Sequence, residues 1–480
     1  MSTLQVYNTL TRQKAAFVPR VAGEVGMYLC GPTVYDDCHI GHLMGPVLFD
    51  AVARWFAVRG HTVRFVNNIT DIDDKIITRA FTTGEPWQDI TARYTAQYRD
   101  LLARLHVTTI TDHPRCTDYV AQMVTYIDNL VRSGRAYVAA DGVWYDVGQQ
   151  PNYGKLSGRK REEMLSDASK DTATSGLRSK ADFALWKLVK PGEPSWPSPW
   201  GDGRPGWHIE CSVMSLHTLG ADFDVHAGGE ELKFPHHENE IAQGEAHGGG
   251  YARCWMHNNL VQFEGSKVSK SDPRMREPAF SLQFQAKAVV AAHGASVIRF
   301  LLLNGHYRRP VDFAPGNIGA IRTALGRLHK AIGGDLDIAG NAPLAEIEAR
   351  PLSEPAAKHR SRFVAAMDDD FNTGAAIAEL FGLAGLISKA GADEAATLRL
   401  LLRDLGRLIG LFQPSDGADT TQTAGAADGT LDTVMSLVLD LRQKARANRD
   451  FATSDLIRDR LKTAGIVVKD GKDGATWERT

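Results

Sequence analysis

The stretch VGMYLCGPTVY (residues 25–35) decides the fold, together with the two segments that follow it. It is a short apolar run broken by Gly-Pro, which predicts a strand that ends in a loop. The next segment, GHLMGPVLFDAVARWFAVRG (41–60), has apolar residues at helical spacing and predicts a helix. HTVRFVNNITD (61–71) is a second strand-like run that ends in polar residues. The order strand, helix, strand predicts a parallel, Rossmann-like sheet with ligands at the strand ends.

The rest of the chain divides by composition. A stretch rich in Gly, Ser, Lys, Pro and Trp predicts an insertion within the sheet domain, and a later Ala-, Leu- and Arg-rich stretch predicts a helical bundle. The predicted fold class is α/β: a Rossmann-like parallel-sheet catalytic domain with an insertion, followed by a helical bundle and a small C-terminal module. The predicted segments are 1–114 and 201–315 for the two halves of the catalytic domain, 115–200 for the insertion, 316–412 for the bundle, 413–430 for a flexible linker and 431–480 for the C-terminal module.

Composition excludes several classes of protein. At 480 residues, with 55 Lys and Arg against 57 Asp and Glu, the chain is a multidomain globular protein whose overall charge points to no polyanionic partner, so any RNA must be bound by local patches. No apolar run reaches the ~18 residues that span a bilayer, and the N-terminal stretch lacks the apolar core of a secretory signal. The five scattered cysteines do not suit a disulfide framework. These features predict a cytoplasmic protein with reduced thiols and no membrane partner.

Two motifs have the chemistry of phosphate binding. His39-Ile40-Gly41-His42 lies between the first predicted strand and its helix, where backbone amides and the helix dipole favour anions and two imidazoles can donate to a triphosphate. The string Lys267-Val268-Ser269-Lys270-Ser271 places two ammonium groups beside a hydroxyl, which suits pyrophosphate. Taken singly, the first string is equally compatible with a capped helix bearing surface histidines, and the second with a solvated basic loop.

The third constellation, called the Cys–His–Glu cluster below, consists of Cys30, Cys211, His236 and Glu240. His236 and Glu240 are four residues apart after Pro235, so a helix that begins there presents both on one face. Two thiolates, an imidazole and a carboxylate are a plausible tetrahedral zinc site. Spacing alone leaves open the alternative of two buried cysteines and a hydrogen-bonded helical histidine.

Taken in order, these strings resemble the cysteinyl-tRNA synthetases, a branch of the class I aminoacyl-tRNA synthetases. The resemblance extends nearly from end to end, and several long strings in the family's order are far more specific than any one of them. The matching strings are 6–10, 30–36, 39–42, 68–75, 206–212, 234–241, 267–271, 366–373 and 450–477.

The resemblance implies a two-step reaction. Cysteine and ATP would give cysteinyl-adenylate and pyrophosphate, and the cysteinyl group would then pass to the terminal ribose of tRNA(Cys). By this likeness His39 and His42 bind the phosphates and the adenosine side of ATP. Lys270 binds the pyrophosphate oxygens with help from Lys267, and Mg2+ accompanies the ATP.

The resemblance also implies that the Cys–His–Glu cluster binds one zinc ion (Zn2+) per chain. Serine is a near-isostere of L-cysteine, and pocket shape separates such pairs by only about one to two orders of magnitude. A zinc ion that already holds thiolates prefers a further thiolate to a hydroxyl, so no editing domain is expected. The rest of the amino-acid pocket would be formed by Gly31, Thr33, Thr70 and Trp207, with Trp207 closing over it.

On the RNA side, the resemblance assigns the bundle and the C-terminal module to the anticodon stem and loop of tRNA(Cys), and it implies a monomer. Four basic residues of the C-terminal module either contact phosphates or form the solvated face of a helix; they are Arg442, Lys444, Arg446 and Arg449.

The chain departs from the family at two places. The strings 39–42 and 267–271 resemble the first and second signature motifs of the class I family. In the second signature Val268 replaces a methionine, and residues 272–274 replace the usual continuation of the motif; we expect altered loop kinetics rather than loss of chemistry. Ala227 and Glu231 replace a glycine and an aspartate, and we expect both to lie near the nucleotide and to affect ATP affinity. Two rival interpretations remain: a cysteine ligase with an amino-sugar acceptor, and a noncatalytic sensor that binds tRNA or cysteine.

Overall fold

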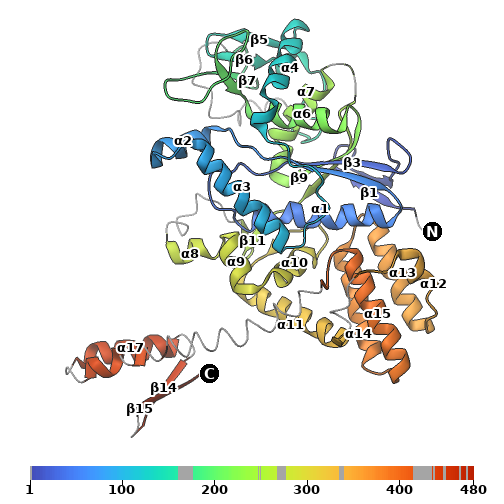
Figure 1. Ribbon diagram of the computed structural model, residues 1–480, viewed down its shortest axis with the longest axis vertical. Helices are drawn as coiled ribbons and strands as arrows, with labels where there is room; N and C mark the ends of the chain where they lie inside the picture. Colours follow the sequence, from blue (N-terminus) through green and yellow to red (C-terminus); the bar gives the residue numbers. More distant parts are fainter. Residues whose placement is uncertain are drawn as a thin grey trace. The chain divides into compact units, whose positions relative to one another are not determined.

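The computed structural model describes residues 3–159, 177–246, 248, 250–267, 277–334, 340–413, 435, 438–439, 441–446, 450–463, 466–471 and 474–479 (Figure 1). The chain forms two compact units, Met1–Asp416 and Gly417–Thr480, and each is described by itself. Within the described residues no single helix is long and apolar enough to cross a membrane; one sharply bent pair, Ala286–His293 with Ala295–Leu303, meets that criterion by length and composition.

A four-stranded parallel sheet lies at the centre of the first unit. Its strands are β3 (Glu24–Leu29), β4 (Thr62–Asn67), β9 (Phe223–Gly229) and β10 (Ala252–Asn258), in the order β10-β9-β3-β4. The strand order reverses between β3 and β9, which makes their carboxyl ends the topological switch point where open α/β sheets bind ligands. The predicted α/β fold class is therefore confirmed.

The two faces of β3 pack against different helices because side chains alternate along a strand. Met27 and Leu29 belong to one apolar core with α1 (Gly41–Val58), whereas Tyr28 belongs to a second core with α6 (Trp207–Leu219). Both faces are covered, so β3 reads as a nearly continuous apolar run rather than an alternating one.

The insertion forms a sheet of its own and contacts the helix that carries two residues of the cluster. Its strands β5 (Ala136–Ala139), β6 (Gly142–Tyr145), β7 (Phe183–Leu188) and β8 (Gly203–Pro205) are antiparallel and pair in sequence order. Two of its tyrosine hydroxyls donate to backbone oxygens of α7 (His236–Glu245): Tyr145 to Ala242 at 2.8 Å and Tyr126 to Gln243 at 2.7 Å.

The helical bundle follows the second half of the sheet domain and is joined to it through a buried ion pair. Arg299 on α10 donates to Asp50 on α1 at 2.5 Å and to the backbone oxygen of Ile409, just beyond the last bundle helix, at 3.0 Å. The helices of this part are α10 (Ala295–Leu303), α11 (Pro315–Ile332), α12 (Leu344–Ala349), α13 (Glu354–Asp368), α14 (Thr373–Ile387) and α15 (Ala392–Leu408).

The remaining elements of the first unit are short or connect the parts named above. They are β1 (Gln5–Asn8), β2 (Gln13–Ala16), α2 (Asp74–Thr83), α3 (Trp87–Arg104), α4 (Val120–Arg132), β11 (Val261–Phe263), β12 (Ser266–Lys267), α8 (Pro278–Leu282), α9 (Ala286–His293) and β13 (Val311–Asp312), with three short 3-10 turns at Cys116–Tyr119, Val147–Gln149 and Glu230–Lys233.

The second unit contains α17 (Phe451–Thr463) followed by an antiparallel hairpin of β14 (Ile466–Gly471) and β15 (Gly474–Arg479). Of the four basic residues singled out in this unit, Arg442 is buried, whereas Lys444 and Arg446 are exposed. Arg449 lies outside the described residues. Burial excludes Arg442 from a solvated helix face.

Candidate functional site

The loops that leave β3 and β4 fix the position of Cys30 at the switch point. The Cys30 backbone N–H donates to the Ala227 oxygen of β9 at 3.2 Å, and the Gly31 N–H donates to Asn68 Oδ1 at 2.7 Å. A Cβ atom at Gly31 would lie 1.6 Å from the Asn68 backbone oxygen, so only glycine permits this approach. The Cys30 thiol is therefore held where the two central strands end.

The structure brings all four residues of the Cys–His–Glu cluster together. Cys211 lies on the second turn of α6, and His236 and Glu240 are one turn apart on α7, the helix that begins after Pro235 as predicted. One donor atom from each of the four residues lies within 4.8 Å of all the others. The Glu240 Oε1 atom is 3.4 Å from Cys30 Sγ and 3.1 Å from His236 Nε2.

These distances and donor types fit a zinc ion. Bonds of about 2.0–2.3 Å in a tetrahedron place neighbouring donor atoms roughly 3.3–3.8 Å apart. The separation of Cys30 Sγ and Glu240 Oε1 is within that range. A set with two sulfur atoms favours zinc over Mg2+ or Ca2+, which prefer oxygen ligands.

Charge at the cluster also favours a cation. A hydrogen bond with Cys30 lowers the pKa of Cys211, which favours its thiolate form. Burial opposes ionisation of Glu240, but His226 and His236 outweigh it and hold the pKa of this carboxyl below its ordinary value. Two buried anionic donors thus face the point where the four side chains meet.

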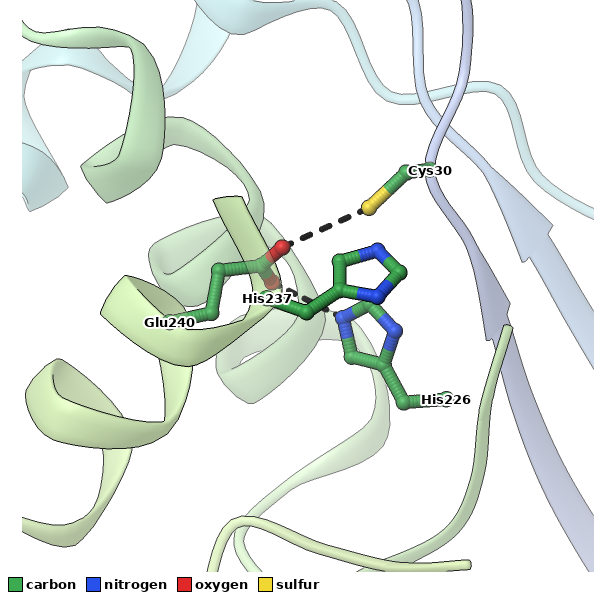
Figure 2. A group of neighbouring side chains, drawn as sticks. All are labelled: Cys30, His226, His237 and Glu240. Carbon is green, nitrogen blue, oxygen red and sulfur yellow. Dashed lines mark hydrogen bonds and ion pairs between the residues drawn. The ribbon is translucent and has the colours of Figure 1, made fainter. Parts of the chain in front are cut away.

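Neighbouring side chains orient the carboxylate and the imidazole of the cluster. Figure 2 shows that the two Glu240 oxygens face different partners, Cys30 on one side and His226 on the other. The second oxygen, Oε2, lies 2.8 Å from His226 Nε2 and accepts a hydrogen bond from the Tyr251 hydroxyl at 2.8 Å. His236 Nδ1 lies 3.0 Å from a nitrogen of His208, which leaves Nε2 facing the cluster.

A second group, Cys30, His226, His237 and Glu240, also brings its donor atoms within 4.8 Å of one another (Figure 2). It shares two members with the Cys–His–Glu cluster but has only one sulfur. His226 Nε2 is hydrogen-bonded to Glu240 and His237 Nδ1 to a neighbouring imidazole at 2.8 Å, which are the kinds of contact that His236 also makes, so the number of sulfur atoms is what distinguishes the two sets. We therefore favour the set with two thiols. Sequence reasoning missed His226 and His237, although a histidine within an otherwise apolar strand was a signal for His226.

The residues predicted to form an amino-acid pocket lie around the cluster. Thr33 and Thr70 form a parallel β-bridge, and the Thr70 hydroxyl donates to Glu210 Oε2 at 3.0 Å. The Trp207 ring stacks on His236, with centroids 4.3 Å apart, and 39% of Trp207 is exposed. With Gly31 next to Cys30, all four predicted residues adjoin the cluster, and their role toward a substrate stays a prediction.

A cavity of about 460 Å³ adjoins the start of α1 and contains both histidines of the first signature. The His39 and His42 rings stack with centroids 3.7 Å apart. Of the two residues expected near the nucleotide, Glu231 lines the cavity and Ala227 is buried in the sheet core; their effect on ATP affinity stays a prediction. The lining consists of Asp36, Asp37, His39, Ile40, Gly41, His42, Met44, Glu231, Asn258, Asn259, Leu260, Val261, Gln262, Ser281, Phe284 and Gln285.

The second signature falls largely outside the described residues. Lys267 ends β12, where its backbone pairs with Gln262, a residue of the cavity lining. Lys270, and with it the altered stretch 268–274, is outside the described part of the chain. The predicted roles of the two lysines therefore stay predictions.

Three family models match the chain. They describe a catalytic domain of class I (C) tRNA synthetases over residues 16–323, a DALR domain over 362–413 and a cysteinyl-tRNA ligase anticodon binding domain over 435–477. The cysteine–tRNA ligase of Laribacter hongkongensis is 44% identical over 480 residues, which are 99% of this chain and 100% of the relative. That of Alkalilimnicola ehrlichii is 44% identical over 482 residues, with 99% and 100% covered.

Solved structures of other synthetases share the fold at low identity. Methionyl-tRNA synthetase of Mycobacterium tuberculosis, bound by methionyl-adenylate, gives a TM-score of 0.58 at 14% identity and covers 84% of this chain and 93% of its own. The LeuRS of Agrobacterium radiobacter K84, in a ternary complex, gives 0.56 at 12% identity, with 83% and 87% covered.

Proposed function

The chain belongs to the cysteine–tRNA ligase family of class I aminoacyl-tRNA synthetases, and from this premise we propose how its own residues select cysteine and carry the reaction. The observation that carries the proposal is one of position. The Cys–His–Glu cluster and the cavity at the start of α1 both lie at the carboxyl end of β3, where the class I sheet changes strand order.

We propose that the Cys–His–Glu cluster holds one zinc ion. When bound there, zinc supplies a site that takes the substrate's sulfur as a thiolate and disfavours the hydroxyl of serine. The cluster's own contribution is rigidity. Glu240 is fixed by His226 and Tyr251, and His236 is held between His208 and the Trp207 ring.

The remaining pocket residues bind the backbone of cysteine in this proposal. The Thr70 hydroxyl donates its proton to Glu210 and accepts from Asn68 Nδ2 at 3.3 Å, so one oxygen lone pair is left to accept from the substrate ammonium. Gly31 lets the loop after β3 lie against the Asn68 backbone beside the pocket, and Thr33 is held next to Thr70 by their β-bridge. Trp207, which is partly exposed, covers the bound amino acid and excludes water.

The activation step takes place between this pocket and the cavity. The cysteine carboxylate attacks the α-phosphorus of ATP, and His39 and His42 donate hydrogen bonds to phosphate oxygens on which charge develops. Lys270, assisted by Lys267, follows the departing pyrophosphate, and Mg2+ accompanies ATP as part of the substrate. The bundle and the C-terminal module of a single chain then hold tRNA(Cys). The terminal ribose of this tRNA attacks the adenylate.

The experiment that tests the proposal is cysteine-dependent ATP–pyrophosphate exchange, measured beside serine with the zinc content of the same sample. Exchange that requires cysteine, ignores serine and follows bound zinc supports the proposal. Exchange that proceeds equally without zinc, or accepts serine, contradicts the selection mechanism. Charging of tRNA(Cys) rather than of an amino sugar then identifies the acceptor.

A further inference from the structure

A lysine and a tyrosine lie together at the junction of the two parts of the site. Lys75 belongs to the first turn of α2, in the segment that follows Thr70, and its ammonium lies 5.7 Å from the centroid of the Tyr35 ring. Tyr35 donates its backbone N–H to Thr33 at 3.2 Å. It is followed directly by Asp36 of the nucleotide cavity. The pair therefore connects the amino-acid pocket to the nucleotide cavity.

The local contacts do not neutralise the charge of Lys75. Its backbone N–H is capped by Asp73 at 2.9 Å, but the neighbouring carboxylate of Asp74 is engaged by Lys187 at 2.8 Å and by Arg204. Within the described part of the chain the Lys75 ammonium has no ion pair, and its side chain is exposed. A cation in the first turn of a helix is also opposed by the helix dipole.

A phosphate oxygen is a suitable partner for the exposed Lys75 ammonium, and the reaction brings a phosphate there. The terminal ribose of tRNA has to reach the adenylate, which forms between the two pockets that flank Tyr35 and Lys75. The unpaired end of tRNA carries a phosphodiester at every nucleotide, whereas the phosphates of ATP belong to the cavity of His39 and His42. A compact ammonium over an aromatic ring is suited to a single phosphate oxygen.

We propose that Lys75, held over the Tyr35 ring, binds a phosphodiester of the single-stranded 3′ end of tRNA and so positions the terminal ribose for transfer. This inference rests on the proposed function, because it requires an adenylate to form beside the pair. Lys75 is a binding residue in this scheme. Tyr35 is a positioning residue that acts through Lys75.

The test compares Lys75→Met with Lys75→Arg, which keeps the charge. Binding is measured with full-length tRNA(Cys) and with a transcript that lacks the unpaired 3′ nucleotides, and ATP–pyrophosphate exchange is measured on the same samples. For Lys75→Met we expect exchange to be unchanged, kcat/KM for tRNA to fall about tenfold, and the loss of affinity to be confined to the full-length tRNA. The salt dependence of its binding should lose roughly 0.7 of log–log slope, as for one single-strand phosphate contact.

The role of Tyr35 is tested by substitutions that keep or remove the ring. Tyr35→Phe should retain the transfer rate, whereas Tyr35→Leu should approach the defect of Lys75→Met, with little added loss when the two are combined. Lys75→Arg should retain most of the salt slope.

Three outcomes overturn the inference. Loss of ATP–pyrophosphate exchange in Lys75→Met would place the lysine on ATP. An equal loss of affinity for the truncated transcript would place the contact of Lys75 elsewhere on tRNA. An unchanged kcat/KM for tRNA would leave Lys75 without a role in transfer. Each is distinct from failure of the proposed function, in which the unsubstituted protein itself shows no cysteine-dependent exchange.

Discussion

Removal of the Cys211 sulfur separates the metal role of this residue from its role in packing. Cys211 is 2% exposed and belongs to the second apolar core, so Cys211→Ala deletes about one buried heavy atom and costs roughly 1 kcal/mol of folding free energy. A loss of that size leaves a protein of this length folded. The same change removes one of the four donors and one of the two thiols of the cluster.

We expect Cys211→Ala to lose stoichiometric zinc and cysteine selectivity together. Without the metal, cysteine and serine differ only in pocket fit, so their ratio of kcat/KM should fall to roughly 10- to 200-fold. The ratio is measured by ATP–pyrophosphate exchange with each amino acid, zinc by elemental analysis and stability by urea unfolding.

The matched control is Cys254→Ala. Cys254 is also buried, at 8% exposure, but it lies on β10 outside the cluster, so this variant should show a similar loss of stability with normal zinc and normal selectivity. The assignment of Cys211 as a ligand is refuted if Cys211→Ala keeps one zinc per chain, or if both variants lose zinc alike.

Three further predictions concern other parts of the site and its support. Tyr251→Phe removes one of the two hydrogen bonds to Glu240 Oε2 and should weaken zinc binding about 10- to 100-fold by competition with a chelator; unchanged affinity would contradict the orienting role. Lys270→Ala should slow adenylate formation far more than it weakens cysteine binding, and an unchanged single-turnover activation rate would reject that role. Asp50→Asn removes the carboxylate that faces the buried Arg299 guanidinium, which keeps its hydrogen bonds to backbone oxygens, and should cost about 3–5 kcal/mol in urea unfolding. Burial opposes ionisation of Asp50, but the charge of Arg299 outweighs burial and lowers the Asp50 pKa in the folded protein. The stability that the ion pair contributes is therefore present above the ordinary aspartate pKa and is lost as the pH falls through the folded pKa. An Asp50→Asn variant whose stability depends on acid pH as the parent's does would disprove this pH dependence.

The sequence predicted the first strand–helix–strand unit well because each of its elements has a local signal. The apolar spacing of 41–60 predicted a helix, and α1 spans Gly41–Val58. The placement of His236 and Glu240 on one helical face also followed from local information, namely a four-residue spacing after Pro235.

The convergence of the cluster could not be predicted from such patterns. Cys30 and Cys211 come together because β3 and β9 are neighbours in the sheet and α6 packs on β3, and strand order has no local signature in a single sequence. The partners of Glu240, His226 and Tyr251, are only 14 and 11 residues away in sequence, but no spacing pattern marks them as its partners. Register is a further property that a motif does not state, and here it places Ala227 in the sheet core.

The contacts of the insertion give it a role in holding α7, the helix that carries His236 and Glu240. Glu240 stands on α7, and the backbone oxygens of Ala242 and Gln243 just beyond it accept the hydroxyls of Tyr145 and Tyr126. These bonds oppose any slide of α7 along its axis, which would move Glu240 away from Cys30 on the separate loop after β3. A donor set assembled from one loop and two helices would discriminate sulfur from oxygen only if its geometry were fixed before the substrate arrives, because adaptable donors would accommodate either atom. If the proposed selection mechanism holds, the insertion supports discrimination at the first binding step, and a separate editing domain has no error to correct.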